Sequence, residues 1–147
     1  MFLLLTWIAV LNSEANWVVR LKQAEAMRRA QEALPFYQEA LALLEPLADR
    51  APLTLSRTLH ESAIALAKAG HRDTSLAQFQ RALTLATNYL APSHRFLATL
   101  HRDYAQLLRQ LHRRREAKQE ENVAKAIWEK HAKENLLGHT VDVRSFR

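Results

Sequence analysis

The chain has 147 residues, with 21 Lys and Arg against 15 Asp and Glu, which gives a formal net charge of +6. The positive excess lies toward the C-terminus, since residues 93–147 hold twelve of the basic residues and only seven of the acidic ones. Cysteine is absent, which excludes disulfide frameworks and thiolate metal sites. Two glycines and four prolines are few for this length and favour long helices joined by short turns.

Residues 2–11, with the sequence FLLLTWIAVL, are almost wholly apolar. A helix that spans a bilayer needs about 20 apolar residues, so this segment is too short to span one. Ser13 and Ala15 would suit a signal-peptide cleavage site, but the positively charged leader is missing. Three interpretations stay open: a secretory signal, a helix that covers the first repeat, or a segment that contacts a preceding repeat or a second copy of the chain.

Amphipathic patterns then predict three pairs of helices. The first pair covers about 13–30 and 32–48, and Pro35 is expected in the first turn of its second helix, where amides have no intrahelical acceptor. The second pair begins at Pro52 and turns at Gly70, and the third covers about 93–111 and 115–134.

The central pair is predicted to be an antiparallel hairpin. Gly70 suits the left-handed conformation that closes many helices, and Asp73 or Thr74 can cap the next helix. Ala63 and Ala82 lie on the apolar faces of the two helices, where small side chains allow the two backbones to approach closely. Because the connection is so short, the two helices must pack side by side.

The same pattern recurs at a spacing of 42 residues without a gap. Small, aromatic and aliphatic positions each fall into register, and a fixed period of this size predicts stacked helical hairpins. The aligned sets are Ala33, Ser75 and Ala117; Tyr37 and Phe79; Ala40, Ala82 and Ala124; Leu43, Leu85 and Ile127; Leu21, Ala63 and Ala105; and Ala24, Leu66 and Leu108.

The small-aromatic-small rhythm Ser75-Phe79-Ala82 after Gly70 resembles the tetratricopeptide repeat, in the 42-residue variety of kinesin light chain. The resemblance covers about residues 13–135 and implies an all-α, right-handed stack of about three antiparallel hairpins that binds other proteins. Arg28 and His112 stand where the pattern has Gly70, and Glu121 stands where it has an aromatic residue. HEAT or armadillo repeats, which have similar periods, are the structural alternative.

The last helix carries Lys118, Glu121 and Lys125 at positions that are apolar in the earlier repeats. Terminal repeats need a polar outer face, so this helix is predicted to cap the array. Its inward side is expected to comprise Ala124, Ile127, Trp128 and His131.

No catalytic motif is present: the sequence has no P-loop, no dinucleotide fingerprint, no HExxH and no glycine-framed serine. It therefore predicts a protein that is not an enzyme and holds no cofactor or metal. The seven histidines are interpreted as helix-surface residues; His94 and His101 can share a helix face, but no carboxylate completes a metal site with them in the sequence.

The run Arg113, Arg114 and Arg115 is the strongest local charge feature. It could bind phosphates of nucleic acid or an anionic surface. Its place at a turn, and the absence of interleaved aromatic residues that would stack on bases, favour a solvated turn and disfavour nucleic acid as the partner.

The resemblance places the first helix of each pair on a concave inner surface. Partner-binding residues predicted there are Lys22, Arg57, His60, Ile64, Lys68, Arg102, Gln106 and Arg109, with Val18 and Glu25 beside them. This wall is net basic with an apolar strip at Val18 and Ile64, which suits an acidic peptide. The carboxylate clamp of chaperone-binding relatives is not expected, because Ile64 and Gln106 stand where asparagine would help.

The sequence thus predicts an apolar segment (1–12), a repeat domain (13–135) and a C-terminal tail (136–147). The predicted function is a protein-interaction module in the cytoplasm, or outside it if the first residues are a signal, that binds a protein or acidic peptide in its groove. Two alternatives stay open: anion or nucleic-acid binding by the arginine run, and an accessory domain that forms a homodimer through residues 2–11.

Overall fold

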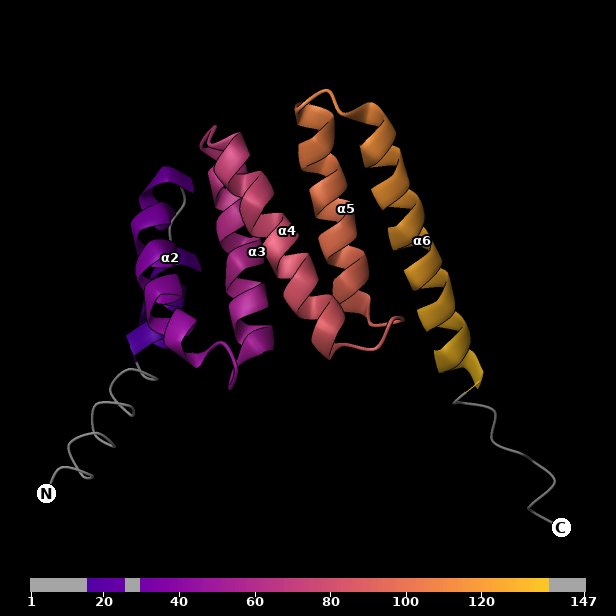
Figure 1. Ribbon diagram of the computed structural model, residues 1–147, viewed down its shortest axis with the longest axis horizontal. Coiled ribbons are helices and arrows are strands. Elements are labelled where there is room, and N and C mark those ends of the chain that lie inside the picture. The colour runs from indigo at the N-terminus through magenta and orange to yellow at the C-terminus, as the bar shows by residue number, and fades with distance from the viewer. Residues whose placement is uncertain (1–15, 26–29, 138–147) are drawn as a thin grey trace, which may run out of the picture. The chain divides into compact units, whose positions relative to one another are not determined.

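The computed structural model describes residues 16–25 and 30–137, and these are helices joined by short turns, without a strand (Figure 1). Residues 16–25 are helical and are followed by α2 (Ala30–Leu44), the short 3-10 helix η1 (Glu45–Leu47), α3 (Pro52–Lys68) and α4 (Arg72–Tyr89). Then come α5 (Arg95–Gln110) and α6 (Arg114–Leu137). The all-α fold class is therefore confirmed. The predictions for residues 2–11 and for the tail after Leu137 lie outside the described residues.

The chain divides into two compact units, one ending at Tyr89 and the other beginning at Leu90. In the first unit α3 packs against both α2 and α4, and in the second α5 packs against α6. The prediction for Pro35 was wrong in one respect. Because α2 begins at Ala30, Pro35 lies in its second turn, and the carbonyl of Gln31 loses the amide that would normally bond to it.

The contact between α3 and α4 is made by small residues, as the sequence predicts. Ala63 and Ala82 are 0% exposed. The Ser56 hydroxyl donates a hydrogen bond of 2.8 Å to the Ala82 carbonyl oxygen, and the Ser75 hydroxyl donates one of 2.7 Å to that of Ala63. A serine side chain reaches an opposite main chain only at very short range, so these bonds confirm the close approach of the two backbones.

The second unit uses alanines at the matching positions. Ala98 and Ala105 on α5 and Ala117 on α6 are fully buried. A hydrogen bond and an ion pair also join these helices: His101 Nδ1 lies 2.5 Å from Glu120 Oε2, and an Arg109 guanidinium nitrogen lies 2.5 Å from Glu121 Oε1. The second pair gives a physical reason for Glu121, which replaces an aromatic residue of the repeat pattern: its carboxylate joins α6 to α5.

The turns of the two hairpins have the same hydrogen bonds at a spacing of 42 residues. The amide of His71 bonds to the Leu66 carbonyl over 2.8 Å, and the amide of Arg113 bonds to that of Leu108 over 2.9 Å. Gly70 has a φ of +91°, and His112 at the matching position has a φ of +60°. His112 therefore adopts the left-handed turn without being glycine, which is uncommon for a residue with a Cβ.

The helix over residues 16–25 packs on α2 and α3 around Ala24, Ala33, Tyr37 and Ala65. An ion pair between Arg20 Nε and Glu39 Oε2, 2.7 Å apart, also joins it to α2. In α6, the polar surface at Lys118 and Lys125 is observed as predicted. Trp128 was predicted to face inward, but it is 40% exposed and lies edge-on against His131.

Ala82→Arg should prevent the first unit from folding, because a long charged side chain would have to enter the contact with Ser56 and leave its charge without solvent. We expect a loss of more than about 4 kcal/mol, seen as loss of cooperative melting by circular dichroism. Ala77→Arg, the same substitution at an exposed position of α4, should melt like the parent. Equal melting temperatures for the two variants would contradict the packing described here.

The two left-handed turn residues should respond in opposite directions to substitution. Gly70→Ala should lower the free energy of unfolding by about 1–2 kcal/mol through backbone strain alone, since an added Cβ would meet no atom within 4 Å. His112→Gly should raise it by about 0.5–1 kcal/mol, because the strain of a non-glycine residue is removed. Urea denaturation measures both changes, and effects of the same sign would be inconsistent with matching turns.

Candidate functional site

Five of the eight predicted partner-binding residues lie in the first unit, and the structure separates them into four groups. Ile64 and Lys68 line one cleft between helices. Arg57 is exposed and lines a smaller hollow beside it. Lys22 is exposed on the helix over residues 16–25 and lines neither. His60 is the exception to the prediction for this surface.

His60 is buried, at 4% exposed, and its ring packs edge-on against Phe79 with ring centres 5.8 Å apart. Its Nδ1 lies 3.6 Å from a carboxylate oxygen of Glu61. A side chain held in this way helps to join α3 to α4 and does not offer its ring to a partner. The interpretation of all histidines as helix-surface residues therefore fails at this position.

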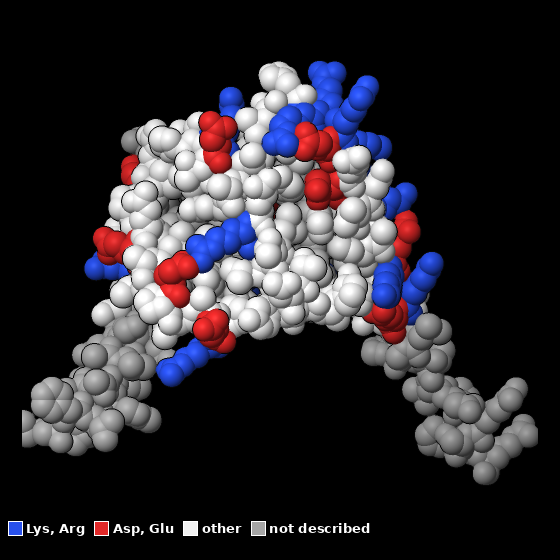
Figure 2. Space-filling model, viewed as in Figure 1, with Lys and Arg blue, Asp and Glu red and all other residues white. Residues whose placement is uncertain are grey.

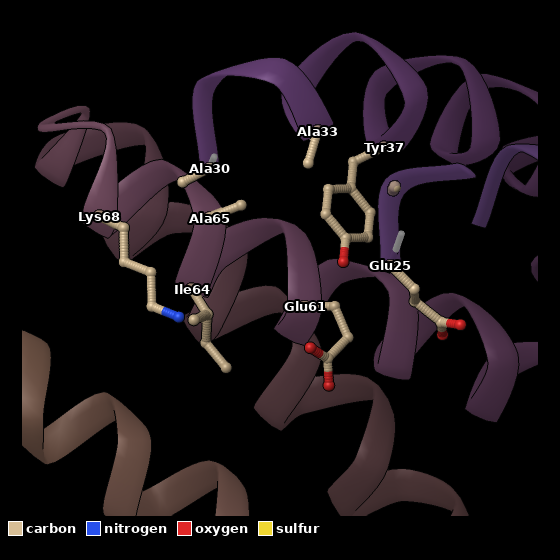
Figure 3. Close-up of a pocket in the computed structure, with 9 residues that line it drawn as sticks. Glu25, Ala30, Ala33, Tyr37, Glu61, Ile64, Ala65 and Lys68 are labelled. Carbon is tan, nitrogen blue, oxygen red and sulfur yellow. The ribbon is translucent and has the colours of Figure 1, made fainter. Parts of the chain in front are cut away.

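The cleft that holds Ile64 and Lys68 has a volume of about 280 Å³ and is formed by three helices, the one over residues 16–25, α2 and α3 (Figure 3). Alanines, Ile64 and Tyr37 form part of its wall, and charged residues of both signs form the rest. The lining residues are Ala24, Glu25, Ala30, Ala33, Tyr37, Glu61, Ile64, Ala65 and Lys68. Four alanines leave the space open, because their side chains are too small to fill the gap between the helices.

The α3 side of the cleft is a single helical stripe. Glu61, Ile64 and Lys68 are spaced three and four residues apart, which places them on one face of the helix. Figure 3 shows the carboxylate of Glu61 and the ammonium group of Lys68 on either side of Ile64. The cleft is therefore negative toward Glu61, apolar at Ile64 and positive at Lys68.

Tyr37 from α2 completes the negative end. Its hydroxyl is directed toward Glu61 and lies between Glu61 and Glu25 in the close-up (Figure 3). Burial, followed by the negative charges of Glu61 and Glu25, raises the pKa of Tyr37 to about 12. The phenol is thus neutral at ordinary pH, and a partner meets one hydroxyl and two carboxylates at this end.

A second hollow of about 220 Å³ adjoins the first and shares Glu25 and Glu61 with it. Its other lining residues are Leu21, Thr54, Arg57 and Thr58. Arg57 is therefore on the far side of the two carboxylates from Lys68. The predicted basic wall is, in this unit, a surface in which two cations flank two anions.

The remaining three predicted residues, Arg102, Gln106 and Arg109, are exposed on α5 in the second unit. The positive charge of both arginines is offset by acidic neighbours. Arg102 Nε lies 2.9 Å from Asp103, and Arg109 pairs with Glu121. These two carboxylates therefore reduce the net positive charge that the sequence predicted for the exposed face of α5.

Basic side chains gather where α5 turns into α6 (Figure 2). Arg113 donates hydrogen bonds of 2.7 and 2.5 Å to Glu116, which lowers the pKa of that carboxyl group. Arg114 and Arg115 are exposed and form no ion pair with the carboxylates that the structure describes. Cations in the first turn of a helix oppose its dipole, so helix stability does not explain this run.

His101 has an acidic neighbour that the sequence analysis did not find, because Glu120 lies one helix away in α6. Even so, no three side chains among His, Asp and Glu come together as a metal site within residues 16–25 and 30–137. In the same part of the chain, no helix is both long enough and apolar enough to cross a membrane.

Two polar residues of the cleft, Tyr37 and Glu61, were not predicted to contact a partner. Tyr37 was interpreted only as a packing aromatic residue, and Glu61 was not considered. The spacing of Glu61, Ile64 and Lys68 on α3 was visible in the sequence and could have identified Glu61. Nothing local could have placed Tyr37 beside it, because the two residues belong to different helices.

The raised pKa of Tyr37 predicts a specific loss of stability at high pH. Its ordinary value is 10.0 and its folded value is about 12, so the unfolded chain releases the proton first, and the contribution of the neutral phenol is lost between these two pH values. The difference in free energy of unfolding between the parent and Tyr37→Phe should be constant below pH 10 and shrink above it. A difference that does not change up to pH 12 would show that Tyr37 is not shielded in this way.

No family model and no curated protein matches this sequence.

Proposed function

We propose that the chain is a non-enzymatic protein-interaction module that holds an extended segment of a partner protein in the cleft of its first unit. We further propose that its hairpins form a right-handed stack of three repeats of the tetratricopeptide-like kind. The turns that share their hydrogen bonds at a 42-residue spacing support the repeat, as do the small residues buried in register at Ala33, Ser75 and Ala117.

The observation that carries the proposal is the form of the cleft. A wall of alanines and Ile64, surrounded by a charged rim, is the arrangement by which grooves bind peptides: apolar surface contributes affinity, and placed polar groups fix the orientation. One turn of a helix with its side chains, about 10 Å wide and about 5.4 Å long, occupies roughly 400 Å³, which is more than the cleft volume of about 280 Å³. An extended segment of a few residues fits better.

A purely acidic peptide is a poorer partner than the sequence suggested. Glu25 and Glu61 would repel it at one end of the cleft, and Lys68 alone would attract it at the other. The acidic partner expected from the basic wall is therefore replaced, in this proposal, by a segment of mixed charge.

A second candidate function is binding of a phosphate-rich polymer by the basic turn. One observation favours it: Arg114 and Arg115 are exposed and have no acidic partner among the described residues. Arg109 and Arg113, by contrast, already pair with Glu121 and Glu116, which leaves few cations for phosphates. We therefore rank this function below peptide binding.

The test of the proposed function is a selection from a random peptide library with the full chain, followed by affinity measurements on two variants. Ile64→Gln introduces the residue type found at the matching position of α5 and removes the apolar contact in the cleft. It should weaken the selected peptides about fivefold to tenfold, or about 1–1.4 kcal/mol, because fully burying an aliphatic side chain contributes about 1.5–3 kcal/mol and Ile64 is already half-buried in the free chain. Val123→Gln, a similar change at an exposed position of α6, should not alter their affinity.

Equal affinities for the two variants would contradict binding in the cleft. If no library peptide responds to Ile64→Gln and a single-stranded nucleic acid instead binds with an affinity that falls steeply between about 50 and 200 mM salt, as happens when several phosphates are neutralised, the second candidate function would replace the first.

A further inference from the structure

We infer that the partner segment carries a carboxylate and a cation about three residues apart, with the cation seated between Glu25 and Glu61 and the carboxylate at Lys68. This inference rests on the proposed function and specifies the partner of the same cleft. It follows from the order of charges along α3 and from the distance between them.

The cation has the stronger of the two subsites. Glu25 and Glu61 lie on different helices and both line the cleft, and the hydroxyl of Tyr37 is directed toward this end (Figure 3). A lysine or arginine side chain that enters here meets two carboxylates and one further acceptor. Charge-assisted hydrogen bonds of this kind are roughly twice as strong as neutral ones.

Three charged or titratable groups around this subsite affect a bound cation. Arg57 lines the adjoining hollow and shares the same two carboxylates, so it reduces their attraction. His60 lies 3.6 Å from Glu61 but is buried and faces Phe79. Lys68 stands beyond Ile64 and repels a second cation, which restricts the positive end of the ligand to the subsite at Glu61.

The spacing between the two ligand charges follows from helix geometry. Glu61 and Lys68 are seven residues apart on α3, which corresponds to about 10 Å along the helix axis. A chain in the polyproline II conformation advances about 3.1 Å per residue and returns to the same face every third residue, after about 9 Å. Side chains three residues apart can therefore reach both charged groups, and the residues between them lie over Ile64.

Four fluorescently labelled peptides of eight residues test the inference with the full chain. Each has a leucine between two charged positions three residues apart, and the charged pairs are glutamate then lysine, lysine then glutamate, two glutamates, and two lysines. One of the two mixed peptides should bind about fivefold tighter than either peptide with like charges, because each exposed ion pair contributes up to about 1 kcal/mol. Which of the two mixed peptides is preferred depends on the direction in which the bound peptide runs along α3.

The decisive variant is the double charge exchange Glu61→Lys with Lys68→Glu. It keeps the net charge, and both residues are exposed, so the fold is preserved and circular dichroism checks this. The preference between the two mixed peptides should reverse. An unchanged preference, or equal binding of all four peptides by the parent, would overturn the inference.

The result also separates this inference from the function on which it rests. If all four peptides bind equally and Ile64→Gln weakens each of them, the cleft binds peptides but the charge order is refuted. If none of the four binds and no library peptide responds to Ile64→Gln, both the charge order and the proposed function are refuted. Val123→Gln serves as the matched control in each case.

Discussion

The close contact between α3 and α4 is the constraint on which the first unit depends. Alanine at positions 63 and 82 removes the side chains that would separate the helices, and the hydroxyls of Ser56 and Ser75 then reach carbonyl oxygens of the opposite main chain. The second unit has buried alanines at the matching positions, and a His101–Glu120 hydrogen bond and an Arg109–Glu121 ion pair join α5 to α6. Small residues thus fix how the helices pair, and larger ones fill the space around them.

The same choice of residues produces the cleft. Where Ala63 lies against Ser75 and Ala82 lies against Ser56, small side chains allow two helices to touch. Where Ala24, Ala30, Ala33 and Ala65 lie between three helices, small side chains leave an open space instead. Alanine therefore allows either a close helix contact or an open cleft, according to the distance between the helix backbones. The charged side chains Glu25, Glu61 and Lys68 then determine which partner side chains the cleft can bind.

The sequence was sufficient for the features that depend on local periodicity. The 42-residue register identified the buried small positions, and the left-handed turn at Gly70 followed from glycine itself. His112 shows the limit of that reasoning: its side chain gave no sign of the same turn, which is closed by main-chain hydrogen bonds from His112 to Arg109 and from Arg113 to Leu108. The helical pattern also predicted that Trp128 lies on the inner side of α6, but the structure leaves this side chain partly exposed.

The sequence by itself determined that the chain is helical, which faces of its helices are apolar, and where most of the helices end, because these properties depend on residues a few positions apart. Only the tertiary structure decided which charges meet. Glu25, Tyr37 and Glu61 line the same cleft although they come from three different helices and are far apart in the sequence. Arg109 on α5 likewise pairs with Glu121 on α6. The charge of a surface depends on such distant pairs, and for that reason a wall that is basic in the sequence becomes a cleft of mixed charge.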